Sequence, residues 1–142
     1  MRQTAQTMRR LLAAFPESAD DWQRYQYSDS YEPGEPYNDV SWMAHRLVGS
    51  MKASKTAGFD TFFLTIEGML ESASSEVREL MTAGFLEDLQ NSSLNSSIPL
   101  EAWEPWLGPS ARDAWRAVAG LWSGDLPADE FNRHVRGAVS QP

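Results

Sequence analysis

The sequence of 142 residues contains no cysteine and only two histidines. Without cysteine, the chain cannot form a disulfide, a thiolate metal site or a cysteine nucleophile. No run of about 18 apolar residues is present, so no segment is predicted to span a bilayer. The N-terminal segment lacks an apolar stretch followed by a cleavage site, so no signal peptide is predicted. We therefore expect a soluble, cytoplasmic protein.

Catalytic signatures are also missing. His45 and His134 belong to no HExxH, HxxxH or ExxH pattern, so neither histidine has a predicted set of metal ligands around it. No serine lies in GxSxG or SxxK, and the isolated glycines form no phosphate-binding loop. We therefore expect a protein that is not an enzyme and that uses no metal or other cofactor.

The composition is that of a folded domain. Hydrophobic residues make up 42% of the chain, which includes six Trp and six Phe, so core material is ample. We expect one domain over residues 1–142. The net charge of −8 opposes binding to nucleic acid or to an anionic membrane surface, since both would repel the chain.

Apolar residues recur at helical spacing along most of the chain, and no stretch alternates convincingly like a strand. We predict an all-α fold of about seven helices, in antiparallel hairpins that form a compact bundle or a short solenoid. The predicted helical segments are 4–15, 16–26, 37–51 with Asn38 or Asp39 as its N-cap, 59–73, 75–91, 99–106, 110–122 and a last helix that starts near Asp125 and Pro127 and carries Phe131, Val135 and Val139.

Four local features sharpen this prediction. The stripe from Phe59 to Leu70 is the widest apolar stripe and should lie at the centre of the core. The polar segment 91–97 should be a loop. Ser110 and Asp113 have the spacing of a capping box, and Trp115 and Trp122 should share one buried face.

The segment YQYSDSYEPGEPYND, residues 25–39, is the most unusual part of the sequence. It holds four tyrosines and four acids but no Lys or Arg, and its prolines and glycine predict a turn or loop over residues 31–37. Residues 15–39 carry seven acids and one base, a local charge of −6, which leaves −2 for the rest. This segment is either a solvated, mobile acidic loop or a binding surface.

A binding surface would use these residue types well. Tyrosine is enriched in binding hot spots because it gives rigid, amphipathic contact area, and acids steer a basic partner. Trp103 and Trp106 flank a proline and are either packed in the core or part of a partner surface. The candidate partner-binding residues are Tyr25, Tyr27, Asp29, Tyr31, Glu32, Glu35, Tyr37, Asp39, Trp103 and Trp106.

Two other functions remain open. A helical adaptor between protein chains would bind through apolar surface and would be insensitive to salt. A metal-dependent enzyme that uses carboxylates alone would draw on Glu67 and Glu71, one turn apart, or on the pair Glu87 and Asp88. A solvated helix face also explains these four acids.

Several segments carry a resemblance to a known family. These are LLAAFPE, YNDVSWMAHRLV, VRELMTAGFLEDLQN and WLGPSARDAW, the most specific parts being GFLEDLQN (84–91) and LGPSARDAW (107–115). In segment order the chain resembles small all-helical bacterial immunity proteins encoded beside polymorphic or contact-dependent growth inhibition toxins. The resemblance implies a protein that binds and neutralises a cognate toxin domain. That toxin is expected to be basic, and a nuclease is one class that fits. The segment 25–39 has no counterpart in this resemblance.

Overall fold

The all-α prediction is confirmed by a computed structural model, which describes residues 2–72, 74–124 and 126–135. Within these ranges the chain forms eight α-helices and three shorter helical segments, and no strand occurs among them. The elements are α1 (Arg2–Ala14), η1 (Pro16–Ser18), α2 (Ala19–Gln26), α3 (Pro36–Lys52), α4 (Phe59–Leu70), α5 (Ser75–Glu79), η2 (Leu80–Leu86), α6 (Glu87–Asn95), η3 (Leu100–Trp106), α7 (Pro109–Ser123) and α8 (Ala128–Val135).

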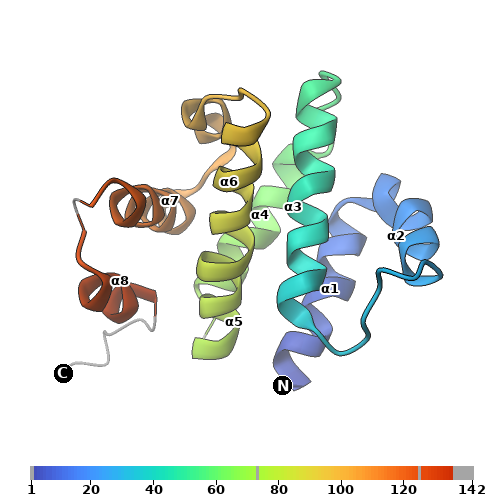
Figure 1. The fold of residues 1–142 in the computed structure, drawn as a ribbon, viewed down its shortest axis with the longest axis horizontal. Coiled ribbons are helices and arrows are strands. Elements are labelled where there is room, and N and C mark those ends of the chain that lie inside the picture. Colours follow the sequence, from blue (N-terminus) through green and yellow to red (C-terminus); the bar gives the residue numbers. More distant parts are fainter. Residues whose placement is uncertain (1, 73, 125, 136–142) are drawn as a thin grey trace.

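Helix α4 provides the centre of the core, as its apolar stripe predicts. Five of its side chains have no exposed surface: Phe59, Phe62, Phe63, Ile66 and Met69. Each such side chain stabilises the fold by about 1.5 to 3 kcal/mol relative to an exposed one. Helices α1, α5 and α7 pack against α4, together with η2 and η3. Figure 1 shows α1, α2 and α3 on one side of the molecule and α7 and α8 on the opposite side.

The segments α5, η2 and α6 form one continuous helix from Ser75 to Asn95, in which η2 is a π-helical stretch. The predicted N-terminus is confirmed, because the Ser74 hydroxyl accepts a hydrogen bond from the Val77 amide at 3.2 Å. Gly84 lets this helix approach α3 closely. A Cβ atom built there would lie 3.0 Å from Tyr37 Cδ1 and 3.1 Å from Val40 Cγ2.

The prediction of a loop over 91–97 is wrong, because the helix continues to Asn95 and buries Ser92 and Ser93. The hydroxyl of Ser93 forms hydrogen bonds inside the protein in place of hydrogen bonds to water. It donates to the Leu89 carbonyl at 2.6 Å and accepts from Trp103 Nε1 at 2.8 Å. Serine favours loops, but a serine whose hydroxyl forms such hydrogen bonds is tolerated inside a helix.

The C-terminal part adds a small second cluster, in which Val118 of α7 and Phe131 of α8 are buried together. Trp115 is buried as predicted, but Trp122 is 56% exposed, so that prediction is wrong. Trp122 lies in the last turn of α7, which the main core does not reach. Asp125 and Val139 lie outside the described residues. No described helix is both long enough and apolar enough to cross a membrane.

Candidate functional site

The acidic, tyrosine-rich segment 25–39 spans the end of α2, a loop over residues 27–35 and the first turn of α3 (Figure 1). α2 ends at Gln26, as the predicted helix over 16–26 does, and the turn or loop predicted over 31–37 is confirmed up to Glu35. The predicted N-cap of the following helix is wrong. Pro36 occupies the first helical position and Glu35 precedes it, because the fixed φ of proline suits a first turn and its missing N–H costs nothing there.

The four tyrosines have different environments. Tyr25 and Tyr31 pack with Trp22 and Trp42 in one aromatic cluster, with ring centroids 5.1 to 5.8 Å apart. Tyr27 is 83% exposed, and Tyr37 is 48% exposed and packs partly against Gly84. Two tyrosines therefore fix the segment to α3, and two offer free contact area.

An open pocket of about 330 Å³ lies between this segment and α3, and we call it the α2–α3 pocket. Four of its residues are spaced i, i+3, i+4 and i+7 along α3, so they share one face of that helix. Tyr25 comes from α2 and Ser30 from the loop. The lining residues are Tyr25, Ser30, Asn38, Ser41, Trp42 and His45.

Hydrogen bonds orient the polar lining. Asn38 Nδ2 donates to Glu32 Oε1 at 3.4 Å, which leaves the amide oxygen of Asn38 as an acceptor. His45 Nδ1 lies 2.8 Å from the Ser41 carbonyl, so in the neutral ring Nδ1 carries the proton and Nε2 is an acceptor. The Ser41 side chain is hydrogen-bonded to Asp88 of α6. Ser41 and His45 therefore do not form the hydroxyl–imidazole bond of a nucleophilic triad.

Three carboxylates interact with residues that line the pocket. Glu32 bonds to Asn38, and Asp88 interacts with Ser41 and His45. Burial raises the pKa of Asp88, while the Ser41 hydrogen bond and His45 lower it in part. Burial and then the Glu35 charge raise the pKa of Asp39. Burial raises the pKa of the Tyr25 hydroxyl, and the charge of Asp39 raises it further. In each case burial, and for Asp39 and Tyr25 also a neighbouring negative charge, disfavours the ionised form.

Arginines on α2 and α3 are already engaged with another acid. Arg24 and Arg46 both pair with Asp21, and Arg46 Nε lies 2.8 Å from Asp21 Oδ2. Within the described part of the chain, no Lys or Arg pairs with Asp29, Glu32, Glu35 or Asp39. Asp39 Oδ1 is also buried without a hydrogen-bond partner there. The acids that border the pocket are therefore available to a cation from outside.

The carboxylates proposed for metal chemistry do not gather in one site. Glu67 caps α7: its Oε2 accepts from the Ser110 amide at 2.7 Å and its Oε1 from the Ala111 amide at 2.8 Å. The predicted capping box of Ser110 and Asp113 is therefore wrong, because Gly108 is the N-cap and Glu67 supplies the carboxylate. Across residues 2–72, 74–124 and 126–135, no group of three or more His, Asp or Glu is arranged to hold a metal ion.

Trp103 and Trp106 lie away from this pocket. Trp103 has no exposed surface and stacks on Phe59 with centroids 5.7 Å apart, so it offers no contact area to a partner. Trp106 is half-buried and packs edge-on against Phe59 at 5.0 Å. We therefore leave both out of the candidate site, because the core below η3 uses their rings.

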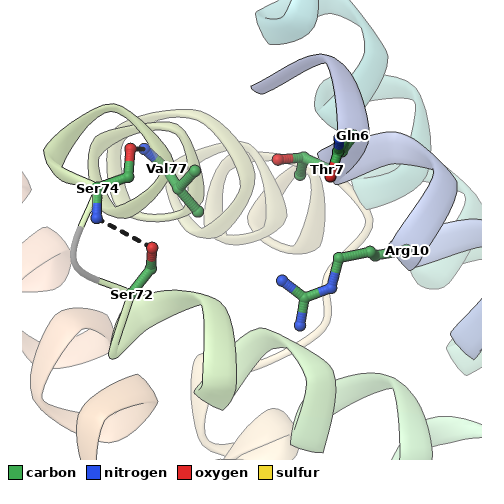
Figure 2. Close-up of a pocket in the computed structure, with 6 residues that line it drawn as sticks. All are labelled: Gln6, Thr7, Arg10, Ser72, Ser74 and Val77. Atoms are coloured by element: carbon green, nitrogen blue, oxygen red, sulfur yellow. Dashed lines mark hydrogen bonds between the residues drawn. The ribbon is translucent and has the colours of Figure 1, made fainter. Parts of the chain in front are cut away.

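A second, smaller pocket has the opposite electrostatic character (Figure 2). It measures about 150 Å³ and is lined by Gln6, Thr7, Arg10, Ser72, Ser74 and Val77. Arg10 extends from α1 towards the turn between α4 and α5, as Figure 2 shows. Because Ser72 and Ser74 use their hydroxyl oxygens to accept amide hydrogens of this turn and of α5, this pocket serves mainly the start of that helix.

Sequence reasoning found part of the candidate site. Tyr25, Glu32 and Asp39 come together at the pocket, whereas Asp29 and Glu35 lie exposed on the loop beside it. It missed Asn38, Ser41, Trp42, His45 and Asp88. The signal for four of these was the polar and aromatic face of the 36–52 helix, opposite its apolar stripe. Asp88 is brought in only by the packing of α6 on α3.

Comparisons with known proteins identify the family without giving a function. Neither the curated proteins nor the solved structures contain a match to this chain. One family, described as "Domain of unknown function (DUF7674)", matches residues 8–123, which include the whole α2–α3 pocket and Asp88 but end before α8. The chain therefore belongs to the DUF7674 family.

Proposed function

We propose that this protein is a non-catalytic immunity protein that binds a basic protein, a cognate bacterial toxin domain, and neutralises it in the cytoplasm of the producing cell. The observation that carries the proposal is the uncompensated acidic surface around the α2–α3 pocket. Glu32 and Asp39 interact with residues that line the pocket, Asp29 and Glu35 belong to the same segment, and none of the four has a Lys or Arg partner among the described residues.

The energetics favour an external partner for this surface. Burial raises the pKa of Asp39, Glu87 and Asp88, so at neutral pH each charged form is held at some cost to folding stability. A basic partner would supply the missing countercharges and would also be steered to the surface by its field. Carboxylates placed in this way can occupy the phosphate positions of a nuclease cleft, so a nuclease fits as the toxin.

Exposed aromatic area complements this charge. Tyr27 is 83% exposed next to Asp29, and such a side chain can bury a large surface with little loss of conformational freedom. An adaptor that binds through Trp103 and Trp106 receives less support, because the first is buried and the second is packed against Phe59. The charged surface is therefore the part of the molecule that best fits a partner.

The test is a capture experiment from the native cell at low and at high salt. The variant carries Asp29→Lys, Glu32→Lys and Glu35→Lys, three exposed positions beside the pocket. The matched control carries Asp60→Lys, Glu101→Lys and Asp113→Lys, three exposed positions on α4, η3 and α7. Both triple variants change the net charge equally, so only the location of the change differs.

We expect wild type and control to retain one basic protein that high salt releases, and the pocket variant to lose it. Co-expression of the captured protein should then stop growth unless the wild-type chain is present. Capture that depends neither on salt nor on the three acids would overturn the proposal and would favour an apolar adaptor surface. A captured protein that is harmless to the cell would also contradict an immunity role.

A further inference from the structure

We propose that the α2–α3 pocket is a binding site for a guanidinium group, supplied by an arginine side chain of the protein partner. This inference rests on the proposed function for the source of the arginine, but the chemistry of the pocket can be tested without any partner. An arginine side chain of the partner would enter this one cavity. The pocket would therefore contribute most to the specificity for a basic protein.

The size and walls of the pocket fit a planar cation. A volume of about 330 Å³ is much larger than the roughly 30 Å³ that a water takes up, so a side-chain head group can enter. Tyr25 and Trp42 both line the cavity and stack on each other, with ring centroids 5.8 Å apart and planes inclined by 23°, so a cation can approach only the ring faces turned away from this stack. Aromatic rings attract a cation placed near their faces, and Trp is the strongest of them.

The polar lining consists largely of acceptors. The amide oxygen of Asn38 is left as an acceptor because its nitrogen donates to Glu32, and in the neutral ring of His45 Nε2 is an acceptor because Nδ1 donates to the Ser41 carbonyl. These orientations are set by internal hydrogen bonds and hold without a ligand. Such a lining favours a ligand with many hydrogen-bond donors, and a guanidinium group has five N–H donors in one plane.

Three carboxylates that interact with lining residues favour a cation over a neutral donor. Glu32 holds Asn38, Asp88 holds Ser41, and Asp39 acts on Tyr25, so each carboxylate is linked to a different lining residue. Arginine suits this arrangement better than lysine does. Its flat, weakly hydrated head group can stack on Trp42 and reach several acceptors at once, whereas an ammonium is a compact, strongly hydrated charge.

The probe is a short capped peptide, acetyl-Gly-Arg-Gly-amide, titrated into the full chain. Two matched peptides replace Arg by citrulline, its neutral isostere, or by Lys, and free arginine is a fourth ligand. Binding is followed by the indole N–H signal of Trp42 in a two-dimensional NMR spectrum. That signal is assigned by its disappearance in Trp42→Phe.

We expect the arginine peptide to shift the Trp42 signal saturably, with a dissociation constant in the millimolar range, as befits one side chain. The lysine peptide should bind more weakly, and the citrulline peptide should give no saturable shift. Free arginine should bind no better than the peptide, because the acids repel its α-carboxylate and this repulsion offsets the attraction of its α-ammonium group. Tighter binding of free arginine would overturn the protein source and indicate a small-molecule ligand instead.

Variants locate the effect. Asp39→Asn and Asp88→Asn keep the side-chain shape, and each should weaken the arginine peptide about two- to five-fold, the scale of one charge pair near a protein surface. Asp113→Asn, on the exposed side of α7, is the control and should change nothing. Equal binding of citrulline and arginine peptides, or equal affinity in all three variants, would overturn the inference.

These outcomes separate the two proposals. An arginine-selective pocket in a chain that captures no toxin would retain the guanidinium site and refute the immunity function. If the chain captures a toxin in a salt-sensitive way but the arginine peptide does not shift the Trp42 signal, the immunity function is retained and the guanidinium site is refuted.

Discussion

The carboxylates at the junction of α4 and α7 and those around the α2–α3 pocket differ in how the fold treats them. Glu67 accepts two backbone N–H groups at the start of α7, at 2.7 and 2.8 Å. Asp39 has one buried oxygen without a described partner, and burial raises its pKa. Both are acids on helices, yet one contributes to stability and the other detracts from it.

This contrast indicates which acids serve the fold and which are left for an external partner. A helix N-terminus carries unsatisfied amide donors and a partial positive charge, so a carboxylate placed there is stabilised in the isolated chain. Asp39 and Asp88 receive no comparable internal compensation, since the pKa of each is raised overall. Removing an acid that serves the fold should therefore lower stability, and removing an acid near the pocket should lower binding.

Glu67→Ala is expected to give the largest effect. It removes two hydrogen bonds to a charged acceptor and leaves two amides at the start of α7 without their partner, a loss of about 2 to 4 kcal/mol. Urea unfolding measures the loss directly. Glu67→Gln should lose less, because one amide oxygen can still accept. Equal stability of wild type and Glu67→Ala would contradict the capping role.

Gly108→Ala tests the same junction from the other side. A Cβ atom at Gly108 would lie 2.7 Å from Glu67 Oε1 and 2.8 Å from its Cδ, so the carboxylate must move off the helix end. We expect a loss of about 1 to 3 kcal/mol, the usual range for overpacking. In a Glu67→Ala background the same change should cost much less, and a double-mutant cycle measures this coupling. Additive losses would show that the two residues act separately.

The sequence predicted the fold class and the central helix because both follow from local periodicity. Five of the six members of the stripe from Phe59 to Leu70 have no exposed surface, and Leu70 is half-buried. Ser92 and Ser93 are different, because their polar type favours a loop while Trp103 and Leu89 supply partners within the core. A tertiary hydrogen bond between residues ten positions apart leaves no periodic signal.

The candidate site was predictable only where it is local in sequence. Tyr25, Glu32 and Asp39 belong to one segment whose composition is unusual, so the segment was found without the structure. Asp88 reaches the pocket through the packing of α6 on α3, and Glu67 reaches α7 across the core. Neither arrangement can be read from spacing along the chain, so the sequence alone offers Glu67 and Asp88 only as carboxylates that could bind a metal ion.

Asp39→Asn combined with Asp88→Asn should raise stability at neutral pH, the opposite sign to Glu67→Ala. Both acids have raised pKa values in the folded chain, so that chain holds more protons than the unfolded one just above the ordinary carboxyl pKa. Stability therefore falls as pH rises through that window and stays lowered above it. The gain in Tm of the double variant should be full near pH 7 and absent near about pH 3, below the ordinary values.

Thermal unfolding across this pH range provides the measurement, and the arginine peptide provides the complementary one. The double variant should be more stable and should bind the peptide less well. A variant that is less stable than wild type at pH 7 would contradict the assignment of these two acids to binding, since it would show that the fold needs their charges.

Glu71→Ala is expected to change the free energy of unfolding least among these variants. Glu71 lies one turn after Glu67 on the same side of the α4 end, and its Oε2 accepts from the Ser110 hydroxyl at 3.2 Å. Unlike Glu67 it is exposed, so water can replace that bond. We expect a change within about 0.5 kcal/mol in urea unfolding. A loss as large as that of Glu67→Ala would mean that charge near α7, rather than the paired amide hydrogen bonds, holds the two helices together.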